Sequence, residues 1–190
     1  MKNSNIAKFF FELGQAKHVK RSGWWLAGIK DPESIAEHMW RATILGKFIA
    51  NQEGADQNKV VTMLLFHDIA EIRIGDIHKV GQRYLKKKEA ESFAFEDQIK
   101  NLPMHMAKEI SVLEKERSEQ KTKEAMIAKD ADLLECAMQA KEYKEQGYIS
   151  CQDWMQNVKK QLKTKSAKEL FAALENEPST SWWGGLKELD

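Results

Sequence analysis

Three side chains that are costly to bury stand close together in LLFHDIAEIRIGDIH, the sequence of residues 64–78. An apolar run leads directly into His67 and Asp68, and Glu71 follows three residues later. Charged groups are tolerated in apolar surroundings only when they are paired or bound to a metal. An imidazole nitrogen and a carboxylate oxygen both suit a first-row transition metal. The pattern favours a metal site over the alternative of a satisfied core histidine, which is the commoner role of an isolated buried His.

Two more polar residues stand inside apolar stretches elsewhere in the chain. His38 lies in SIAEHMWRA, and Asp132 lies in AMIAKDADLLECAM. Two ligands from one segment would make a weak site, so others must come from distant segments. We expect His38, His67, Asp68 and Asp132 to converge on one metal ion from three helices.

The elements that must position these residues are helical. The chain has three prolines and is rich in Ala, Lys, Glu, Leu and Met, and it lacks a strand-like alternation of useful length. A helix over about residues 57–72 would place His67 and Glu71 on one face, four residues apart. The run KKK at residues 86–88 is expected to be a solvated helix start. Seven or so helices are predicted, including an N-terminal one carrying Ile6 to Leu13, one following DPES, and others over about residues 57–72, 87–101, 103–116, 121–145, 151–162 and 166–174.

Composition narrows the class of protein. The 190 residues carry a formal charge of +1, without the basic excess of a polymeric nucleic-acid binder. No apolar stretch is long enough to cross a bilayer, and the N-terminus lacks a signal-peptide pattern. Cys136 and Cys151 form no metal or redox motif, so we expect reduced thiols in a cytoplasmic protein. No linker or repeat divides the chain, and the tail STSWWGGLKELD is expected to dock on the body or on a second subunit.

The order of a lone His, a His-Asp pair and a distant Asp resembles the HD-domain phosphohydrolases. The chain is similar to their 5'-deoxynucleotidase branch, small all-helical enzymes that hydrolyse deoxyribonucleoside monophosphates. The resemblance implies an all-α fold, a single HD-domain helical bundle with the metal site between helices. That domain would cover residues 1–190, with a core over about residues 30–145 and the C-terminal helices and aromatic tail packed on it. The resemblance is strongest in the blocks KRSGWWLAGIKDPESIAEHMWRA, LLFHDIAEIRIGDI and KDADLLECAMQAKEY.

The resemblance also assigns roles to individual residues. It implies one divalent transition metal (Mn, Co, Fe, Ni or Zn), a nucleotide substrate and a homodimer. The family often has a proline within two residues after GDI, whereas HKVGQRY follows here, so base preference stays open. Its metal ligands fall on His38, His67, Asp68 and Asp132, its catalytic acid on Glu71, its substrate-contacting acid on Asp76, and its phosphate-binding Arg and neighbouring Trp on Arg21 and Trp24.

Each role outside the ligand set has a structural alternative. Glu71 would serve as well to support a ligand, and Arg21 as an ordinary surface residue. Without the resemblance, Trp24 would be interpreted as a core or interface aromatic, and Asp76 as a turn or helix-cap residue. If Asp76 does act on substrate, it either contacts the deoxyribose 3'-hydroxyl or helps to protonate the leaving 5'-oxygen.

Two other functions remain open at this stage. One is hydrolysis of another phosphate ester, such as a nucleoside triphosphate, a cyclic nucleotide or an alarmone. Cyclic-nucleotide enzymes of this superfamily usually carry additional ligating histidines after the His-Asp pair, which this sequence lacks. The other is a non-catalytic nucleotide sensor, which the intact ligand set disfavours.

Overall fold

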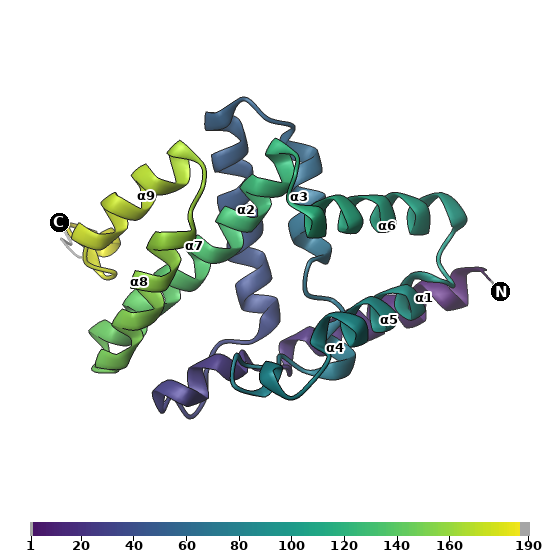
Figure 1. Cartoon of the computed structure of the whole chain (residues 1–190), viewed down its shortest axis with the longest axis horizontal. Helices are drawn as coiled ribbons and strands as arrows, with labels where there is room; N and C mark the ends of the chain where they lie inside the picture. The colour runs from purple at the N-terminus through teal and green to yellow at the C-terminus, as the bar shows by residue number, and fades with distance from the viewer. Residues whose placement is uncertain (1, 187–190) are drawn as a thin grey trace.

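The chain is all-α in the computed structural model, which describes residues 2–186 (Figure 1). The described residues form nine α-helices with turns and short 3-10 helices between them, and they contain no strand beyond one isolated bridge. The predicted fold class is confirmed. The helices are α1 (Lys2–Leu13), α2 (Ile35–Glu53), α3 (Gln57–Phe66), α4 (Glu71–Ile74), α5 (Lys87–Ile99), α6 (Met104–Glu119), α7 (Lys123–Glu145), α8 (Gln152–Gln161) and α9 (Lys165–Asn176).

Helices α2, α3 and α7 form the centre of the molecule and cross one another there (Figure 1). Their shared core contains Ile49 of α2, Leu64 of α3 and Leu134 of α7. Gly46 lets α2 approach α3 closely, because a Cβ atom at this position would lie 2.1 Å from Leu64 Cδ1. This three-helix crossing fixes the elements that carry the predicted ligands.

The start of α2 follows from the sequence DPES. Ser34 forms a capping box with Glu37: Ser34 Oγ accepts from the Glu37 amide at 3.3 Å, and Glu37 Oε2 accepts from the Ser34 amide at 2.6 Å. An isolated antiparallel bridge joins Lys20 to Ser34 beside this cap. The bridge brings Arg21 next to the first turn of α2, because the Arg21 amide donates to the Glu33 carbonyl at 2.9 Å.

The predicted continuous helix over residues 57–72 is wrong. Helix α3 ends at Phe66, and α4 begins only at Glu71. The His67 ring nitrogen Nδ1 donates to the Leu64 carbonyl oxygen at 2.7 Å. In the turns that follow, backbone amides bond carbonyl oxygens three residues earlier, as the Ile72 amide bonds the Ile69 carbonyl oxygen. His67 and Glu71 therefore share a cavity without sharing one helix face.

A second apolar cluster lies away from the central crossing. Phe9 of α1, Phe95 and Ile99 of α5 and Ile110 of α6 pack there around Ile69, which lies between α3 and α4. Figure 1 shows α1, α4 and α5 grouped together, with α6 leading back to the central helices. This cluster holds the segment after His67 in place.

The C-terminal helices α8 and α9 pack against α7 and lie on the opposite side from α6 (Figure 1). In the tail, Trp182 is 75% exposed and Trp183 is 38% exposed. Among residues 2–186, no helix combines the length and apolar character needed to cross a bilayer.

Candidate metal centre

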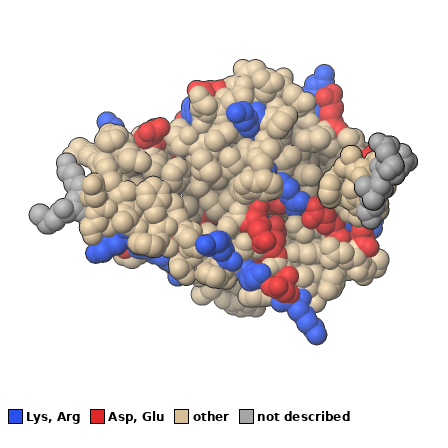
Figure 2. All heavy atoms as spheres, turned by 180° about the vertical axis from the view of Figure 1, so that it is seen from behind, with Lys and Arg blue, Asp and Glu red and all other residues tan. Residues whose placement is uncertain are grey.

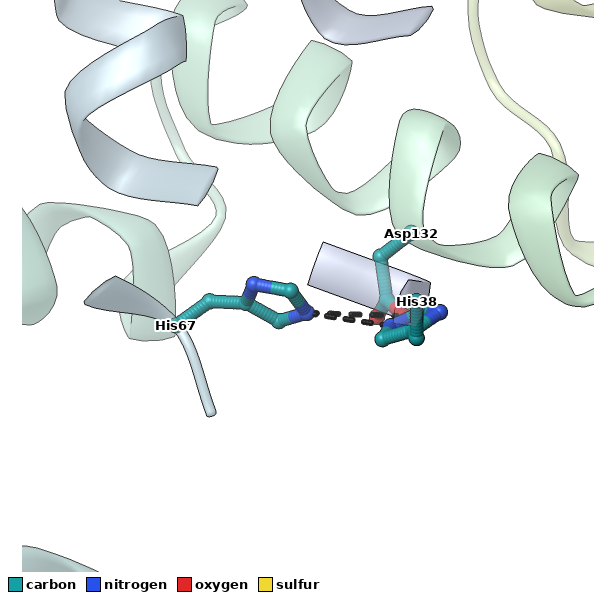
Figure 3. Close-up of side chains that lie close together, drawn as sticks. All are labelled: His38, His67 and Asp132. Atoms are coloured by element: carbon teal, nitrogen blue, oxygen red, sulfur yellow. Dashed lines mark hydrogen bonds and ion pairs between the residues drawn. The ribbon is translucent and has the colours of Figure 1, made fainter. Parts of the chain in front are cut away.

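The four predicted ligands come together where α2, α3 and α7 meet. His38 lies in the first turns of α2, His67 directly follows α3, and Asp132 lies in the middle of α7. Figure 3 shows these three side chains pointing toward one another from separate elements. Their ligand atoms all lie within 4.8 Å of one another.

The distances describe a compact group of donor atoms. His38 Nε2 lies 3.2 Å from His67 Nε2 and 3.2 Å from Asp132 Oδ1. Asp68 Oδ2 lies 3.2 Å from His67 Nε2 and 3.7 Å from His38 Nε2. Both imidazoles are buried, and the two carboxylates are less than one-fifth exposed. His38, His67 and Asp132 therefore form a compact donor group, and Asp68 Oδ2 lies beside its two histidines.

The outer ring nitrogens are held by acceptors, which turns the inner nitrogens toward this centre. His67 Nδ1 donates to the Leu64 carbonyl oxygen at 2.7 Å, and His38 Nδ1 donates to the Glu135 carboxylate. In the neutral rings, both Nε2 lone pairs then face the Asp132 carboxylate. Acceptors so arranged require a cation between them, and two imidazoles with two carboxylates suit a divalent transition metal.

The carboxylates around His38 favour its protonated form. Burial and Arg21 oppose the charged form of His38, but Asp132 and Glu135 outweigh them and raise the pKa of His38 to about 10. Metal binding must displace that proton, so metal affinity is expected to rise with pH.

Both candidate ligand carboxylates are ionised. Burial alone would raise the pKa of Asp68, but His67 and Arg21 hold it well below the usual range. Burial likewise opposes ionisation of Asp132, and Lys129 and His38 outweigh it. Lys129 donates to Asp132 Oδ2 at 2.8 Å, which leaves Oδ1 turned toward the two histidines.

Glu135 supports the site from behind His38. It is fully buried, and it also accepts from Arg41 Nε at 2.9 Å. Glu33, His38 and Glu135 form a second group with ligand atoms within 4.8 Å, but Trp24 and Arg41 already bond its carboxylates. Glu135 thus acts as the hydrogen-bond acceptor that orients the His38 imidazole.

Glu71 lies on the wall of the same cavity. Its side chain is 3% exposed, and Oε1 accepts from Lys87 Nζ at 3.0 Å. Oε2 is buried, and it has no hydrogen-bond partner among residues 2–186. Burial, followed by the charges of Asp68 and Asp76, raises the pKa of Glu71 to about 8, although Lys87 opposes this.

Arg21 and Asp76 border the cavity from neighbouring segments, one before α2 and one after α4. Arg21 Nη1 lies 3.4 Å from Asp68 Oδ2, which places the guanidinium beside the ligand group. Asp76 Oδ2 accepts from the Ser22 amide at 2.8 Å, and the Asp76 carbonyl oxygen accepts from Ser22 Oγ at 2.6 Å. The Asp76 carboxylate therefore also fixes the 3-10 helix Ser22–Ala27 next to Arg21.

Trp24 is almost completely buried. Its indole nitrogen donates to Glu33 Oε1 at 3.0 Å, and its ring packs against Tyr143 and Trp154 with centroids 5.2 and 5.6 Å away. The ring also lines the cavity. The structure thus places Trp24 in the core behind Arg21, with its polar atom already bonded.

The cavity in front of the ligand group has a volume of about 1030 Å³, at the upper end of the range for small-molecule sites. The sequence analysis did not identify several of the lining residues as part of the site. They come from segments that no local pattern links to the His-Asp pair. They are Lys87 of α5, Arg117 of α6, Lys129 of α7 and Trp154 of α8.

The charged surface is mixed in sign. Figure 2 shows acidic and basic side chains lying next to one another near the middle of the back face. The described part of this face carries no broad basic area, which accords with the balanced composition.

Comparisons with known proteins identify the family of the chain. A family model described as "HD domain" matches residues 13–175. A curated relative from Dictyostelium discoideum, named 5'-deoxynucleotidase HDDC2, is 34% identical over 75% of this chain and 80% of its own length. The human protein of the same name is 28% identical over 93% of this chain and 88% of its own length.

A solved structure has the same fold. The protein from Magnetospirillum magnetotacticum named "Predicted metal-dependent phosphohydrolase" aligns with a TM-score of 0.70 and 25% identity, covering 93% of this chain and 92% of that one. The family model spans most of the chain, and its span contains all four predicted ligands. The chain belongs to the HD domain family.

Proposed function

We propose that this protein is a metal-dependent 5'-deoxynucleotidase, which hydrolyses deoxyribonucleoside 5'-monophosphates to a deoxynucleoside and phosphate. The grouping of His38, His67 and Asp132, with Asp68 Oδ2 beside the two histidines, is the observation that carries the proposal. Arg21 borders the same cavity and supplies a cation for the phosphate. The names of the curated relatives support this choice of substrate over other phosphate esters.

The four converging residues would hold one divalent metal ion. Their mixed nitrogen and oxygen donors suit Mn, Fe, Co, Ni or Zn. When bound, such an ion lowers the pKa of water and neutralises charge on phosphoryl oxygens. Phosphate monoesters hydrolyse very slowly in water, so the reaction needs electrostatic help of this kind.

Glu71 would orient the attacking water and accept its proton. The carboxylate is buried in the cavity wall, and its Oε2 atom has no partner in the described part of the chain. A pKa raised to about 8 matches the requirement that a general base and acid work near neutral pH. Glu71 is thus proposed as the residue that moves the proton.

The remaining cavity residues would position the substrate. Arg21 would hold the phosphate through charge-assisted hydrogen bonds, with the donors that Asp68 leaves free. Asp76 would accept a hydrogen bond from the deoxyribose 3'-hydroxyl, because it lines the same cavity and is fixed next to Arg21 by Ser22. Trp24 would contribute only its ring, as a rigid wall behind Arg21.

Phosphate release tests this proposal. Metal-stripped protein resupplied with Mn, Co, Zn or Mg is assayed on deoxynucleoside and ribonucleoside 5'-monophosphates, with Asp68→Ala as the control. Metal-dependent release from the deoxy set, lost in Asp68→Ala, is the expected result. Faster turnover of a triphosphate, cyclic nucleotide or alarmone would replace the substrate, and bound metal without any turnover would favour a nucleotide sensor.

We also propose that the protein is a homodimer. Three apolar side chains at intervals of four residues are exposed on α2, namely Trp40, Ile44 and Phe48. Phe10 and Phe11 of α1 are exposed as well. Apolar side chains grouped in this way are typical of subunit contacts. Light scattering after size exclusion measures the mass, and a monomer at working concentration would contradict the proposal.

A single HD domain over residues 1–190 and a cytoplasmic location complete the proposal. Helices α8 and α9 share one core cluster with α2, α3 and α7, which supports one folding unit. Cys136 and Cys151 are both free thiols, as expected in a reducing compartment. A single cooperative unfolding transition would support the first statement, and co-fractionation with a cytosolic marker would support the second.

A further inference from the structure

Lys87 makes a contact that its place in the run KKK does not predict. Its side chain is 20% exposed, while that of the neighbouring Lys86 is 82% exposed. Lys87 Nζ lies 3.0 Å from Glu71 Oε1 and 3.0 Å from Glu91 Oε1. Lys86 pairs instead with Glu89, on the surface. The expectation of a solvated helix start is therefore wrong for Lys87.

This position is unfavourable for a cation on local grounds. Lys87 is the first residue of α5, where the positive end of the helix dipole disfavours a positive charge. Lys86 precedes it as the cap residue and offers no side-chain cap to the helix. Departures from local preference concentrate at functional sites, where another requirement outweighs them. At Lys87, the requirement that outweighs local preference is the ion pair with Glu71.

The pair leaves the two oxygens of Glu71 in different states. Oε1 is held by the Lys87 ammonium. Oε2 belongs to the same cavity-wall residue and is buried without a partner among the residues that the structure describes. A carboxylate held through one oxygen loses the freedom to rotate, so the other oxygen keeps a fixed place. An unpartnered buried oxygen is costly unless something from the cavity bonds to it.

We infer that Lys87 is a positioning residue, which holds Glu71 through Oε1 so that Oε2 is presented to the attacking water. The inference rests on the proposed function. Lys87 has three donor hydrogens, and Glu71 and Glu91 take two of them. Its ammonium is thus directed at two carboxylates outside the ligand group, whereas Lys129 lies 2.8 Å from Asp132 Oδ2 and Arg21 lies 3.4 Å from Asp68 Oδ2.

Kinetics of single variants test the role. Lys87→Met keeps an unbranched stem and removes the charge, so we expect kcat to fall about 10- to 100-fold, because misplacing a reacting group by about 1 Å costs this much. KM should stay within about twofold, and Lys87→Arg should recover part of kcat. Lys86→Met is the matched control and should leave both constants within about twofold of wild type. A rise in KM alone in Lys87→Met would mean that Lys87 binds phosphate and would overturn the inference.

A double-mutant cycle shows whether Lys87 acts through Glu71. Glu71→Gln alone should lower kcat by about 100-fold or more. If Lys87 acts by placing Glu71, adding Lys87→Met should cost less than a further twofold, roughly. Losses that multiply in the double variant would overturn the inference.

Wild type, Lys87→Met, Glu71→Gln and the double variant are also compared by urea unfolding, without substrate or metal. Lys87→Met should lower the unfolding midpoint, because Glu71 is left buried without its cation, and Glu71→Gln in that background should restore part of the loss. Independent, additive shifts would overturn the pairing. A wild type that turns over without the kinetic coupling refutes only the role of Lys87, whereas a wild type without turnover on any phosphate ester refutes the proposed function itself.

Discussion

Replacing Glu135 with glutamine removes one negative charge from behind the metal centre and leaves the shape of the side chain nearly unchanged. Glu135 is fully buried and accepts hydrogen bonds from His38 Nδ1 and from Arg41 Nε. A hydrogen bond to a charged group contributes about 1.5–3 kcal/mol, and a neutral one about 0.5–1.5 kcal/mol. The substitution therefore weakens the hold on His38 by about 1 kcal/mol or more and makes its imidazole less basic.

The expected result is weaker metal binding in a folded protein. Loss of a partner of a ligating histidine typically lowers metal affinity about 10- to 100-fold, which corresponds to about 1.4–2.8 kcal/mol. Metal-stripped wild type and Glu135→Gln are titrated with Zn or Co in competition with a chromophoric chelator. Circular dichroism and urea unfolding show that the variant has folded.

Glu142→Gln is the matched control. Glu142 also accepts from Arg41, with Nη1 at 2.5 Å, but no hydrogen bond joins it to His38 among the described residues. Its replacement should leave metal affinity within about twofold of wild type, because no partner of a ligating histidine is lost. Unchanged affinity in folded Glu135→Gln, or an equal loss in Glu142→Gln, would refute the assigned role of Glu135.

Three further predictions concern packing, pH and substrate binding. Gly46→Ala should destabilise the protein by about 1–3 kcal/mol in urea unfolding, because its Cβ would lie 2.1 Å from a side-chain atom of α3, whereas Gly14→Ala, with nothing within 4 Å, should not. Burial, followed by the charge of Glu135, raises the pKa of Glu33 from 4.5 to about 7, so the folded apoprotein retains a proton that the unfolded chain loses. The free energy of unfolding should therefore fall as pH rises between these two pKa values. Glu33→Gln should reduce this dependence of the unfolding free energy on pH. Arg21→Ala should raise KM for a deoxynucleoside monophosphate more than about tenfold in steady-state assays, and an unchanged KM would show that Arg21 does not hold the phosphate.

Helix starts follow from local chemistry, so the sequence predicts them well. Ser34, Thr122 and Thr164 each cap the helix that they precede, and Pro103 directly precedes α6. The end of α3 is different. It depends on the bond from the His67 ring to a backbone carbonyl, which the apolar periodicity of this segment does not encode.

The ligand residues stand out in the sequence because each is a polar side chain inside an apolar run. His38 and Asp132 carry this signal in their own helices, and the structure brings their ligand atoms within 3.2 Å. Supporting contacts lack such a signal. Lys87 reaches Glu71 across 16 residues of chain, and only the packing of α4 against α5 brings the two together.

Glu135 is an intermediate case. It lies three residues after Asp132 on α7, so both side chains lie on one side of the helix. That spacing is equally consistent with a surface ion pair. The contact with His38, 97 residues earlier in the chain, shows that Glu135 supports the site and is not part of a surface ion pair. This contact requires the crossing of α2 and α7.

Titrating metal into the stripped protein while following phosphate release from a deoxynucleoside 5'-monophosphate tests the central claim most directly. If His38, His67, Asp68 and Asp132 hold one ion that the reaction requires, activity should rise from zero and reach a plateau at about one equivalent of metal. Asp68→Ala should show neither tight binding nor activity under the same conditions. Full activity in the stripped wild type, or undiminished activity in Asp68→Ala, would contradict the account.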